Sequence, residues 1–501
     1  MRYKSTRSSR EAISASQAIL EGLAPDGGLF VPEEIPSLPC SLEQLAAMNY
    51  REIAFEIMKL YLTDFTEEGL RACIAAAYDG KFDAAEIVPL AKVEDVYFLE
   101  LFHGPTIAFK DMALSILPHL MTTAMKKRGE GRETVILTAT SGDTGKAALG
   151  SFAGVPGTRI LVFYPKDGVS AIQRQQMITQ RGDNTWVIGV EGNFDDCQSG
   201  VKAVFADEEL AKRMEKAGLA FSSANSINIG RLVPQIVYYV YAYARLLREG
   251  EIEKGEPVNI AVPTGNFGNI LAAWYARGMG LPVGRLLCAS NENRVLCDFF
   301  ATGAYDRRRP FILTDSPSMD ILISSNLERL IYELTGCDPE QTASLMGMLS
   351  QEGWYQIDDG MRKRMEAFRG GFASQEESRR EICRIFSECG YVMDTHTAVA
   401  SAVYERYRRE TGDGTKTLIA STASPYKFAP SILRAIKPDW EEQRGEMTEL
   451  EWAFACVEEL SRISGTEIPE AVRGLLGAPV RHERICSVSQ MKRMVEEILG
   501  L

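Results

Sequence analysis

Histidine is scarce in this sequence, and cysteine is never paired at a spacing suited to a metal. The 501 residues include four histidines, without HExxH spacing, and ten cysteines, without a CxxC pair. This pattern disfavours a zinc site, a disulfide framework and a Ser-His-Asp hydrolase. We expect the thiols to be reduced.

Long apolar runs and dense basic stretches are also missing. No run approaches the about 18 uncharged apolar residues of a membrane helix, and the amino-terminal segment MRYKSTRSSREAISASQAIL lacks the apolar core of a signal peptide. The formal net charge is -13, and no stripe of lysine and arginine alternates with aromatic residues. These absences predict a cytoplasmic protein that binds neither a membrane nor a nucleic acid.

What the sequence does contain is a repeated alternation of strand-like and helix-like segments. Apolar residues make up 45% of the chain and charged residues 25%, as in ordinary globular proteins. The strand-like runs include residues 134–138, 159–164, 185–190, 258–262 and 416–421. Such alternation predicts an α/β fold in which helices join parallel strands. Ligand-binding loops are expected directly after these strands.

The chain is long enough for two or three domains. Its first hundred residues mix turns with helix-like stretches, the polar stretch 249–256 suits a loop between lobes, and amphipathic helices follow residue 440. We predict an N-terminal domain over residues 1–97, a smaller α/β lobe with Lys110 over 98–255, and a larger α/β lobe over 256–501.

Lys110 stands between the apolar residues 107–109 and a helix-like run that begins near Met112. A charged amine taken out of water is costly unless it is paired, so a lysine there tends to lose its proton. Asp111 is expected to point to another face of the helix. Two interpretations are open: the side chain snorkels to water, or its amine is kept neutral as a nucleophile or base.

The run 258–262 is followed by Pro-Thr-Gly-Asn-Phe-Gly-Asn at 263–269 and then by a helix-like stretch. Glycines between a strand and a helix let main-chain N–H groups converge on an anion. The segment has the form of a phosphate-binding loop. On this motif alone, an ordinary structural turn is an equal alternative.

The run 134–138 is followed by Ala-Thr-Ser-Gly-Asp-Thr-Gly-Lys at 139–146. Its hydroxyl and N–H groups suit a second anion, such as a substrate carboxylate. A nucleotide-binding P-loop would need glycine at Thr140 and serine or threonine at Ala147. Nucleotide hydrolysis is therefore disfavoured, whereas simple capping of the helix by Ser141 and Thr144 stays open.

Thr422 begins the segment Thr-Ala-Ser-Pro-Tyr-Lys-Phe, directly after the last strand-like run. Its hydroxyl can bond a ligand ring nitrogen, although such a segment alone is a common turn. A nucleophilic lysine, a phosphate loop and a hydroxyl partner together favour pyridoxal phosphate, which needs a lysine Schiff base and a phosphate site.

Five segments of the chain resemble threonine synthases, in the family's order, and more narrowly the longer microbial and fungal branch. They are 99–112 (LELFHGPTIAFKDM), 140–145 (TSGDTG), 222–231 (SSANSINIGR), 263–269 (PTGNFGN) and 421–428 (STASPYKF). The resemblance implies a pyridoxal-phosphate enzyme of fold type II, the tryptophan synthase β-like fold. That fold has parallel sheets with flanking helices, here with a small N-terminal domain.

The resemblance also implies roles for single residues. Lys110 would form the Schiff base with pyridoxal phosphate, and Thr422 would lie beside the pyridine nitrogen. The cofactor phosphate would be held by Gly265, Asn266, Phe267, Gly268 and Asn269. Substrate would be bound by Thr140, Ser141, Asp143 and Thr144 near its carboxylate or the cofactor ring, and by Asn225, Asn228 and Arg231 near its phosphate.

The implied reaction converts O-phospho-L-homoserine and water to L-threonine and phosphate by γ-elimination and β-hydration, the last step of threonine biosynthesis. The protein would be a monomer or a homodimer. Alternatives are another fold type II enzyme, such as a serine or threonine dehydratase or a β-replacing synthase, and a non-catalytic relative that binds pyridoxal phosphate.

Two positions depart from the family pattern. Ser424 stands where a histidine is expected, and Thr395 stands where a proline is expected. The first departure leaves Thr422 in place but removes any role of that histidine. We interpret His396 as a residue of a helix start rather than as a catalyst.

Overall fold

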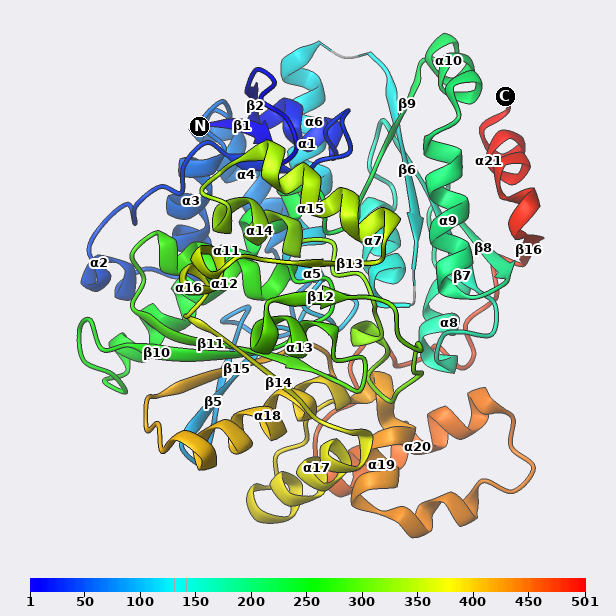
Figure 1. Cartoon of the computed structure of the whole chain (residues 1–501). Coiled ribbons are helices and arrows are strands. Elements are labelled where there is room, and N and C mark those ends of the chain that lie inside the picture. The colour runs from blue at the N-terminus through cyan, green and yellow to red at the C-terminus, as the bar shows by residue number, and fades with distance from the viewer. Residues whose placement is uncertain (130, 141) are drawn as a thin grey trace.

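The computed structural model describes residues 1–129, 131–140 and 142–501 (Figure 1). A six-stranded and a five-stranded sheet form the centres of two lobes, and a three-stranded sheet belongs to an N-terminal domain. We call the lobe around the six-stranded sheet the large lobe and the other the small lobe. The arrangement confirms the predicted α/β class of parallel sheets with flanking helices.

The N-terminal domain holds an antiparallel sheet of order β2-β1-β3. Its elements are β1 (Arg2–Ser5), β2 (Ile13–Ser14), α1 (Ala15–Glu21), β3 (Phe30–Pro32), α2 (Leu42–Ala46), α3 (Tyr50–Tyr61) and α4 (Glu67–Ala77). Helix α3 starts with a capping box between Asn49 and Glu52. Its buried face packs on α11 (Ile229–Arg248), so this domain shares one hydrophobic core with the rest of the chain.

The large-lobe sheet has the order β14-β11-β10-β15-β5-β4. Its strands are β4 (Leu90–Val93), β5 (Val96–Glu100), β10 (Val258–Pro263), β11 (Val283–Ser290), β14 (Phe368–Phe372) and β15 (Thr417–Ser421). All pairs are parallel except β4 with β5. The predicted runs 258–262 and 416–421 correspond to β10 and β15.

Helices and a two-stranded antiparallel sheet lie around that sheet. They are α12 (Gly268–Gly278), α13 (Val295–Thr302), β12 (Ala304–Asp306), α14 (Leu327–Leu334), α15 (Pro339–Gln351), β13 (Trp354–Gln356), α16 (Asp359–Arg364), α17 (Gln375–Cys389), α18 (Thr395–Thr411), α19 (Ala429–Ile436) and α20 (Glu449–Ser464). Two 3-10 turns, η1 (Pro317–Met319) and η2 (Pro425–Phe428), lie in loops that reach the candidate site.

The small-lobe sheet has the order β16-β8-β7-β6-β9, with every pair parallel. Its strands are β6 (Glu133–Ala139), β7 (Thr158–Pro165), β8 (Thr185–Glu191), β9 (Leu219–Ser222) and β16 (Arg484–Ser487). The helices between residues 110 and 220 are α5 (Asp111–Leu114), α6 (Leu117–Arg128), α7 (Asp143–Phe152), α8 (Ala171–Ile178), α9 (Phe194–Phe205) and α10 (Glu208–Lys216). Three predicted strand runs fall within β6, β7 and β8.

The C-terminal end of the chain returns to the small lobe. Strand β16 pairs in parallel with β8, and the last helix, α21 (Met491–Leu499), packs on α9 (Figure 1). The sequence analysis placed these residues with the larger lobe. An amphipathic helix indicates that one of its faces is buried but not which sheet covers that face, so the sequence pattern does not reveal this return.

No helix in the described part of the chain combines the length and the apolar character needed to cross a lipid bilayer.

Candidate active site

Three loops meet at one edge of the large-lobe sheet. Strand β15 lies between β10 and β5 and pairs in parallel with both. The loops that carry Lys110, Thr422 and the glycines of 265–268 therefore leave the sheet side by side, because the carboxyl ends of parallel strands share an edge. Residues separated by about 300 positions in the sequence are brought together in this way.

The loop before Lys110 is bonded directly to the loop that contains Thr422. The Phe109 N–H donates to the Thr422 carbonyl at 2.8 Å, and the Ser424 N–H donates to the Ile107 carbonyl at 3.0 Å. Ile107 has a φ of 53°, a strained conformation for a β-branched residue. The two bonds fix the backbone that leads into Lys110.

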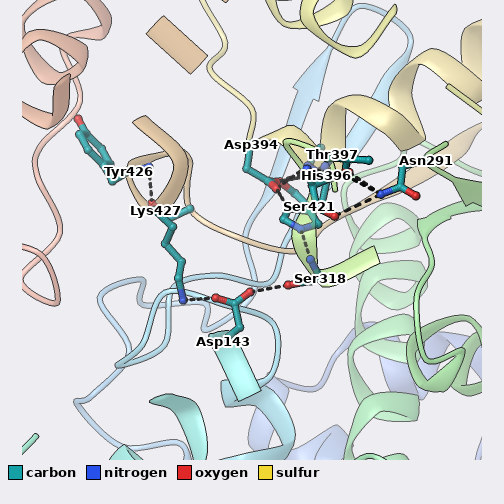
Figure 2. Close-up of polar contacts among 12 residues, drawn as sticks. Asp143, Asn291, Ser318, Asp394, His396, Thr397, Ser421, Tyr426 and Lys427 are labelled. Carbon is teal, nitrogen blue, oxygen red and sulfur yellow. Dashed lines mark hydrogen bonds and ion pairs between the residues drawn. The ribbon is translucent and has the colours of Figure 1, made fainter. Parts of the chain in front are cut away.

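Asp143 is bonded from both sides by donors of different segments. Its Oδ1 accepts from Lys427 Nζ at 2.7 Å and from Gln173 Nε2 at 2.9 Å. Its Oδ2 accepts from Ser318 Oγ at 2.9 Å (Figure 2). The same oxygen lies 3.4 Å from Lys110 Nζ. The carboxylate of α7, in the small lobe, is thus held by Lys427 and Ser318 of the large lobe and by Gln173 of its own lobe.

The electrostatics of this cluster favour a charged carboxylate beside an easily neutralised amine. Burial lowers the pKa of Lys110; the nearby Asp143 opposes this shift, and the charges of Lys427 and Arg231 reinforce it. Burial alone would raise the pKa of Asp143, but the charges of Lys427 and Lys110 hold it well below its usual range. An amine of this kind gives up its proton more readily than an exposed lysine does.

Asp111 directs its carboxylate away from the lysine, as the sequence predicted. It accepts from the Thr106 N–H at 2.8 Å and from the Thr106 hydroxyl at 2.5 Å. The acidic neighbour of Lys110 in the sequence is therefore used to hold the preceding loop, and the acidic neighbour in space is Asp143.

The glycine loop is packed tightly against the segment 318–326. A Cβ atom on Gly265 would lie 2.6 Å from the Ser318 carbonyl oxygen, so only glycine fits there without a shift. Ser324 Oγ donates to the Gly265 carbonyl at 2.7 Å, and Asn326 donates to the Asn266 carbonyl through its N–H at 3.1 Å and its Nδ2 at 3.0 Å. These bonds hold the loop from one side.

The start of α12 offers several hydrogen-bond donors. Phe267 occupies the N-cap position with a φ of 65°, and no side chain among the described residues caps this helix start. The first N–H groups of a helix have no partner within the helix. Asn269 accepts from the Tyr239 hydroxyl, whereas its Nδ2 is buried without a partner in the described chain. Such a set of donors fits a phosphate group.

The second predicted anion loop lies at the start of α7. The Thr140 hydroxyl accepts from the N–H groups of Gly142 at 3.0 Å and Gly145 at 2.8 Å, so this side chain fixes the turn. Thr144 is half-buried. Ser141 lies outside the described residues.

The third predicted group surrounds the start of α11. Asn228 caps the helix, and its Nδ2 donates to the carbonyls of Ile19 and Ser223. Asn225 is half-buried and accepts from the Thr138 hydroxyl at 3.4 Å. Arg231 is buried and donates to a main-chain carbonyl through Nη1, but its Nε has no partner in the described chain.

Burial lowers the pKa of Arg231 to about 10. The guanidinium remains charged at neutral pH, and one of its donors is free for an anionic ligand. Of the three residues predicted near the substrate phosphate, Arg231 is thus the one with an unused buried donor. The roles of Asn225 and Asn228 stay predictions.

Sequence reasoning missed Lys427, Ser318 and Gln173, although all three contact Asp143. It also missed how His396 is used. The Ser318 N–H donates to His396 Nε2 at 3.1 Å, so the proton of the neutral ring lies on Nδ1, which donates to Asp394 Oδ1 at 2.8 Å (Figure 2). His396 positions the Ser318 turn from the start of α18, consistent with a residue of a helix start.

Family models cover nearly the whole chain. Residues 2–78 match the model described as "Threonine synthase N terminus", residues 82–422 match "Pyridoxal-phosphate dependent enzyme", and residues 397–495 match "Threonine synthase, C-terminal".

Similar proteins carry related names. The chain is 38% identical to a threonine synthase of Methylobacillus glycogenes, over 88% of this chain and 93% of that protein. It is 40% identical to "Threonine synthase-like 1" of Macaca fascicularis, over 84% of this chain but only 58% of the length of that relative. A crystal structure of threonine synthase with bound pyridoxal phosphate from Brucella melitensis superposes with a TM-score of 0.85 at 33% identity, covering 100% of this chain and 98% of that one.

Proposed function

The chain belongs to the threonine synthase family of pyridoxal-phosphate-dependent enzymes, and from this premise we propose that it converts O-phospho-L-homoserine and water to L-threonine and inorganic phosphate. One observation carries the proposal. Lys110, whose pKa burial lowers, lies 3.4 Å from the charged Asp143, where the loop of Lys110 meets those of the glycine segment and Thr422.

The residues present fit pyridoxal phosphate. The start of α12 and Asn269 Nδ2 supply donors for its phosphate, and the Lys110 amine would attach to its aldehyde. Thr422, bonded through its carbonyl to the loop of Lys110, would place its hydroxyl beside the ring nitrogen. When bound, the cofactor supplies an electron sink for negative charge that develops on the amino-acid carbons.

The substrate would be held by its two anionic groups. Arg231, with its unused buried Nε, and Asn225 would bind the phosphate, and the loop of Thr140, Ser141 and Thr144 would bind the carboxylate. Such anchors hold the reacting carbons within reach of Lys110. Asn228 would support the phosphate site by capping α11.

Lys110 would move the protons. Once the substrate's amino group has displaced it, the Lys110 amine would be neutral in its buried setting and could take a proton from the carbon next to the carboxylate, and then one from the following carbon. Lys110 would pass on the first proton before it takes the second, and phosphate would leave from the third carbon. One of the two protons would be added to that third carbon and the other would leave with the phosphate; water would then add its hydroxyl to the second carbon and its proton to the carbon next to the carboxylate. Asp143, which lies 3.4 Å from the amine, would keep it oriented.

The experiment measures absorbance, phosphate and threonine from one purified sample. The full-length protein should show an absorption band at the edge of the visible range from the lysine-bound cofactor, and borohydride should remove this band. It should also release phosphate and threonine in equal amounts from O-phospho-L-homoserine. Lys110→Ala should lose the band and at least about 1,000-fold in rate. Lys212→Ala, an exposed lysine of α10, is the matched control and should behave as the wild type.

The products separate this function from its alternatives. A dehydratase would form an oxo acid from serine or threonine, a β-replacing synthase would need a second nucleophile, and a non-catalytic relative would show the absorption band without turnover. Equal yields of phosphate and threonine exclude all three. The cytoplasmic location and a monomeric or homodimeric state belong to the same proposal and stay predictions.

A further inference from the structure

Two lysines share one buried carboxylate at this site. The side chain of Lys427 is 0% exposed, that of Lys110 is 12% exposed, and that of Asp143 is 4% exposed. The pair of amines cannot both be neutralised by a single carboxylate, and an uncompensated buried charge is strongly unfavourable. One of the two lysines must therefore be the natural partner of Asp143.

The contacts identify Lys427 as that partner. Its Nζ lies 2.7 Å from Asp143 Oδ1 and donates to the Thr106 carbonyl at 3.1 Å. The Lys110 Nζ contacts are longer, 3.4 Å to Asp143 Oδ2 and 3.5 Å to Ser318 Oγ. Hydrogen bonds of a charged amine to a carboxylate are typically about 2.7–2.9 Å, so the strong bond is made by Lys427.

The rest of the surroundings hold Lys427 in this role. It lies in the η2 turn between the buried residues Tyr426 and Phe428, directly after the Thr422 loop. Gln173 Nε2 bonds the same carboxylate oxygen from α8, so Asp143 Oδ1 has no room for a third strong donor. The position of Lys427 is thus fixed by packing and by two acceptors.

We propose that Lys427 is a positioning residue that neutralises Asp143, and that this leaves Lys110 as the uncharged amine available for cofactor attachment and proton transfer. The inference rests on the proposed function for the role of Lys110. The charge balance is set by the positions of these three side chains, with Arg231 and the buried Asp111 as nearby charges that the substitutions below leave in place.

The test is the pH at which the Lys110 amine becomes reactive in the cofactor-free full-length protein. Acetic anhydride labels neutral amines, and peptide mass spectrometry reports the labelled fraction of Lys110 at each pH. In Lys427→Met, Asp143 is free to pair with Lys110, so the midpoint should rise by about 1 to 3 pH units. Lys427→Arg keeps the charge and should restore a midpoint near that of the wild type.

Two further variants keep the test decisive if Lys427→Met does not fold. Asp143→Asn removes the carboxylate that contacts both lysines, so the Lys427 charge acts on Lys110 without it and the midpoint should fall below the wild-type value. The double variant Asp143→Asn/Lys427→Met removes both charges and should lie above Asp143→Asn. A thermal melt by circular dichroism verifies that each labelled protein is folded.

The overturning results are a Lys427→Met midpoint equal to the wild-type value, or equal midpoints for Asp143→Asn and the double variant. Either result would make Lys427 a support for its loop only. Failure of the proposed reaction is a separate outcome, because it would appear as absent threonine in the product assay while the labelling midpoints still shifted.

Discussion

Replacement of Gly265 by alanine would perturb the phosphate loop without changing any charge. The new Cβ atom would lie 2.6 Å from the Ser318 carbonyl oxygen, and ordinary contact begins at 3.4 Å, so loop and turn must separate by about 0.8 Å. Overpacking of this size costs about 1–3 kcal/mol. The glycine loop can relieve the strain by moving away from the η1 turn, but it must return to its original position to bind the phosphate of the cofactor.

The strain should therefore appear as lost affinity for pyridoxal phosphate. An energy of about 1–3 kcal/mol corresponds to about 5- to 150-fold weaker binding. The affinity is measured by titrating cofactor into the cofactor-free protein and following the absorption band of the lysine-bound form. The catalytic lysine is unchanged in this variant, so the spectrum at saturation should match that of the wild type.

Gly347→Ala is the matched control. Gly347 lies within α15, and a Cβ atom there would meet nothing within 4 Å. The same substitution should leave cofactor affinity unchanged and stabilise the helix by about 0.5–1 kcal/mol. If Gly265→Ala bound cofactor within a factor of two of the wild type, the reasoning from close packing to phosphate binding would be refuted.

Two further predictions concern Arg231 and Glu333. Arg231→Lys replaces the planar guanidinium by a single ammonium group, so KM for O-phospho-L-homoserine should rise about tenfold or more while the absorption band of the bound cofactor stays intact. Arg248→Lys, at an exposed position, is the control and should leave KM unchanged. An unchanged KM for Arg231→Lys, or an equal rise in the control, would show that Arg231 does not bind the substrate phosphate. Burial raises the pKa of Glu333 from 4.5 to about 7. The folded protein then binds more protons than the unfolded chain, so the contribution of Glu333 to stability is full below pH 4.5 and is lost as the pH rises through 7. Glu333→Gln, which can still accept from Trp274 Nε1, should raise the free energy of unfolding at pH 8 relative to pH 5 by roughly 1–3 kcal/mol in urea titrations; parallel pH profiles for variant and wild type would contradict this.

The strands and loops that could be predicted are those in which the local hydrophobic pattern and the residue types at the strand ends indicate the same structure. Buried parallel strands such as β6, β7 and β10 each contain a continuous apolar run, and each is followed by a loop with glycine and hydroxyl residues. The apolar segment around Lys110 left two interpretations open, and the resemblance to threonine synthases favoured the role of a reactive amine. The expected loop neighbours then followed from the rule that parallel strands share an edge.

What could not be predicted depends on contacts between distant segments. Ser318 and Gln173 belong to stretches without a recognisable motif. Ser318 reaches Asp143 from the other lobe, and Gln173 reaches it from the neighbouring helix α8. Lys427 lies within a segment that resembles the family, yet its partner Asp143 lies 284 positions earlier in the chain. The short apolar flanks of this lysine, Tyr426 and Phe428, were the one local sign that its charge is buried.

The pairing of β16 with β8 has a consequence for how the protein is made. Four strands of the small-lobe sheet are synthesised between residues 133 and 222, but the strand that covers the edge of β8 comes from residues 484–487. Domains generally fold from the N-terminus as they leave the ribosome. From the synthesis of β9 until residues 484–487 are made, the edge of β8 therefore lacks its pairing strand, and an unpaired strand edge is a known template for aggregation.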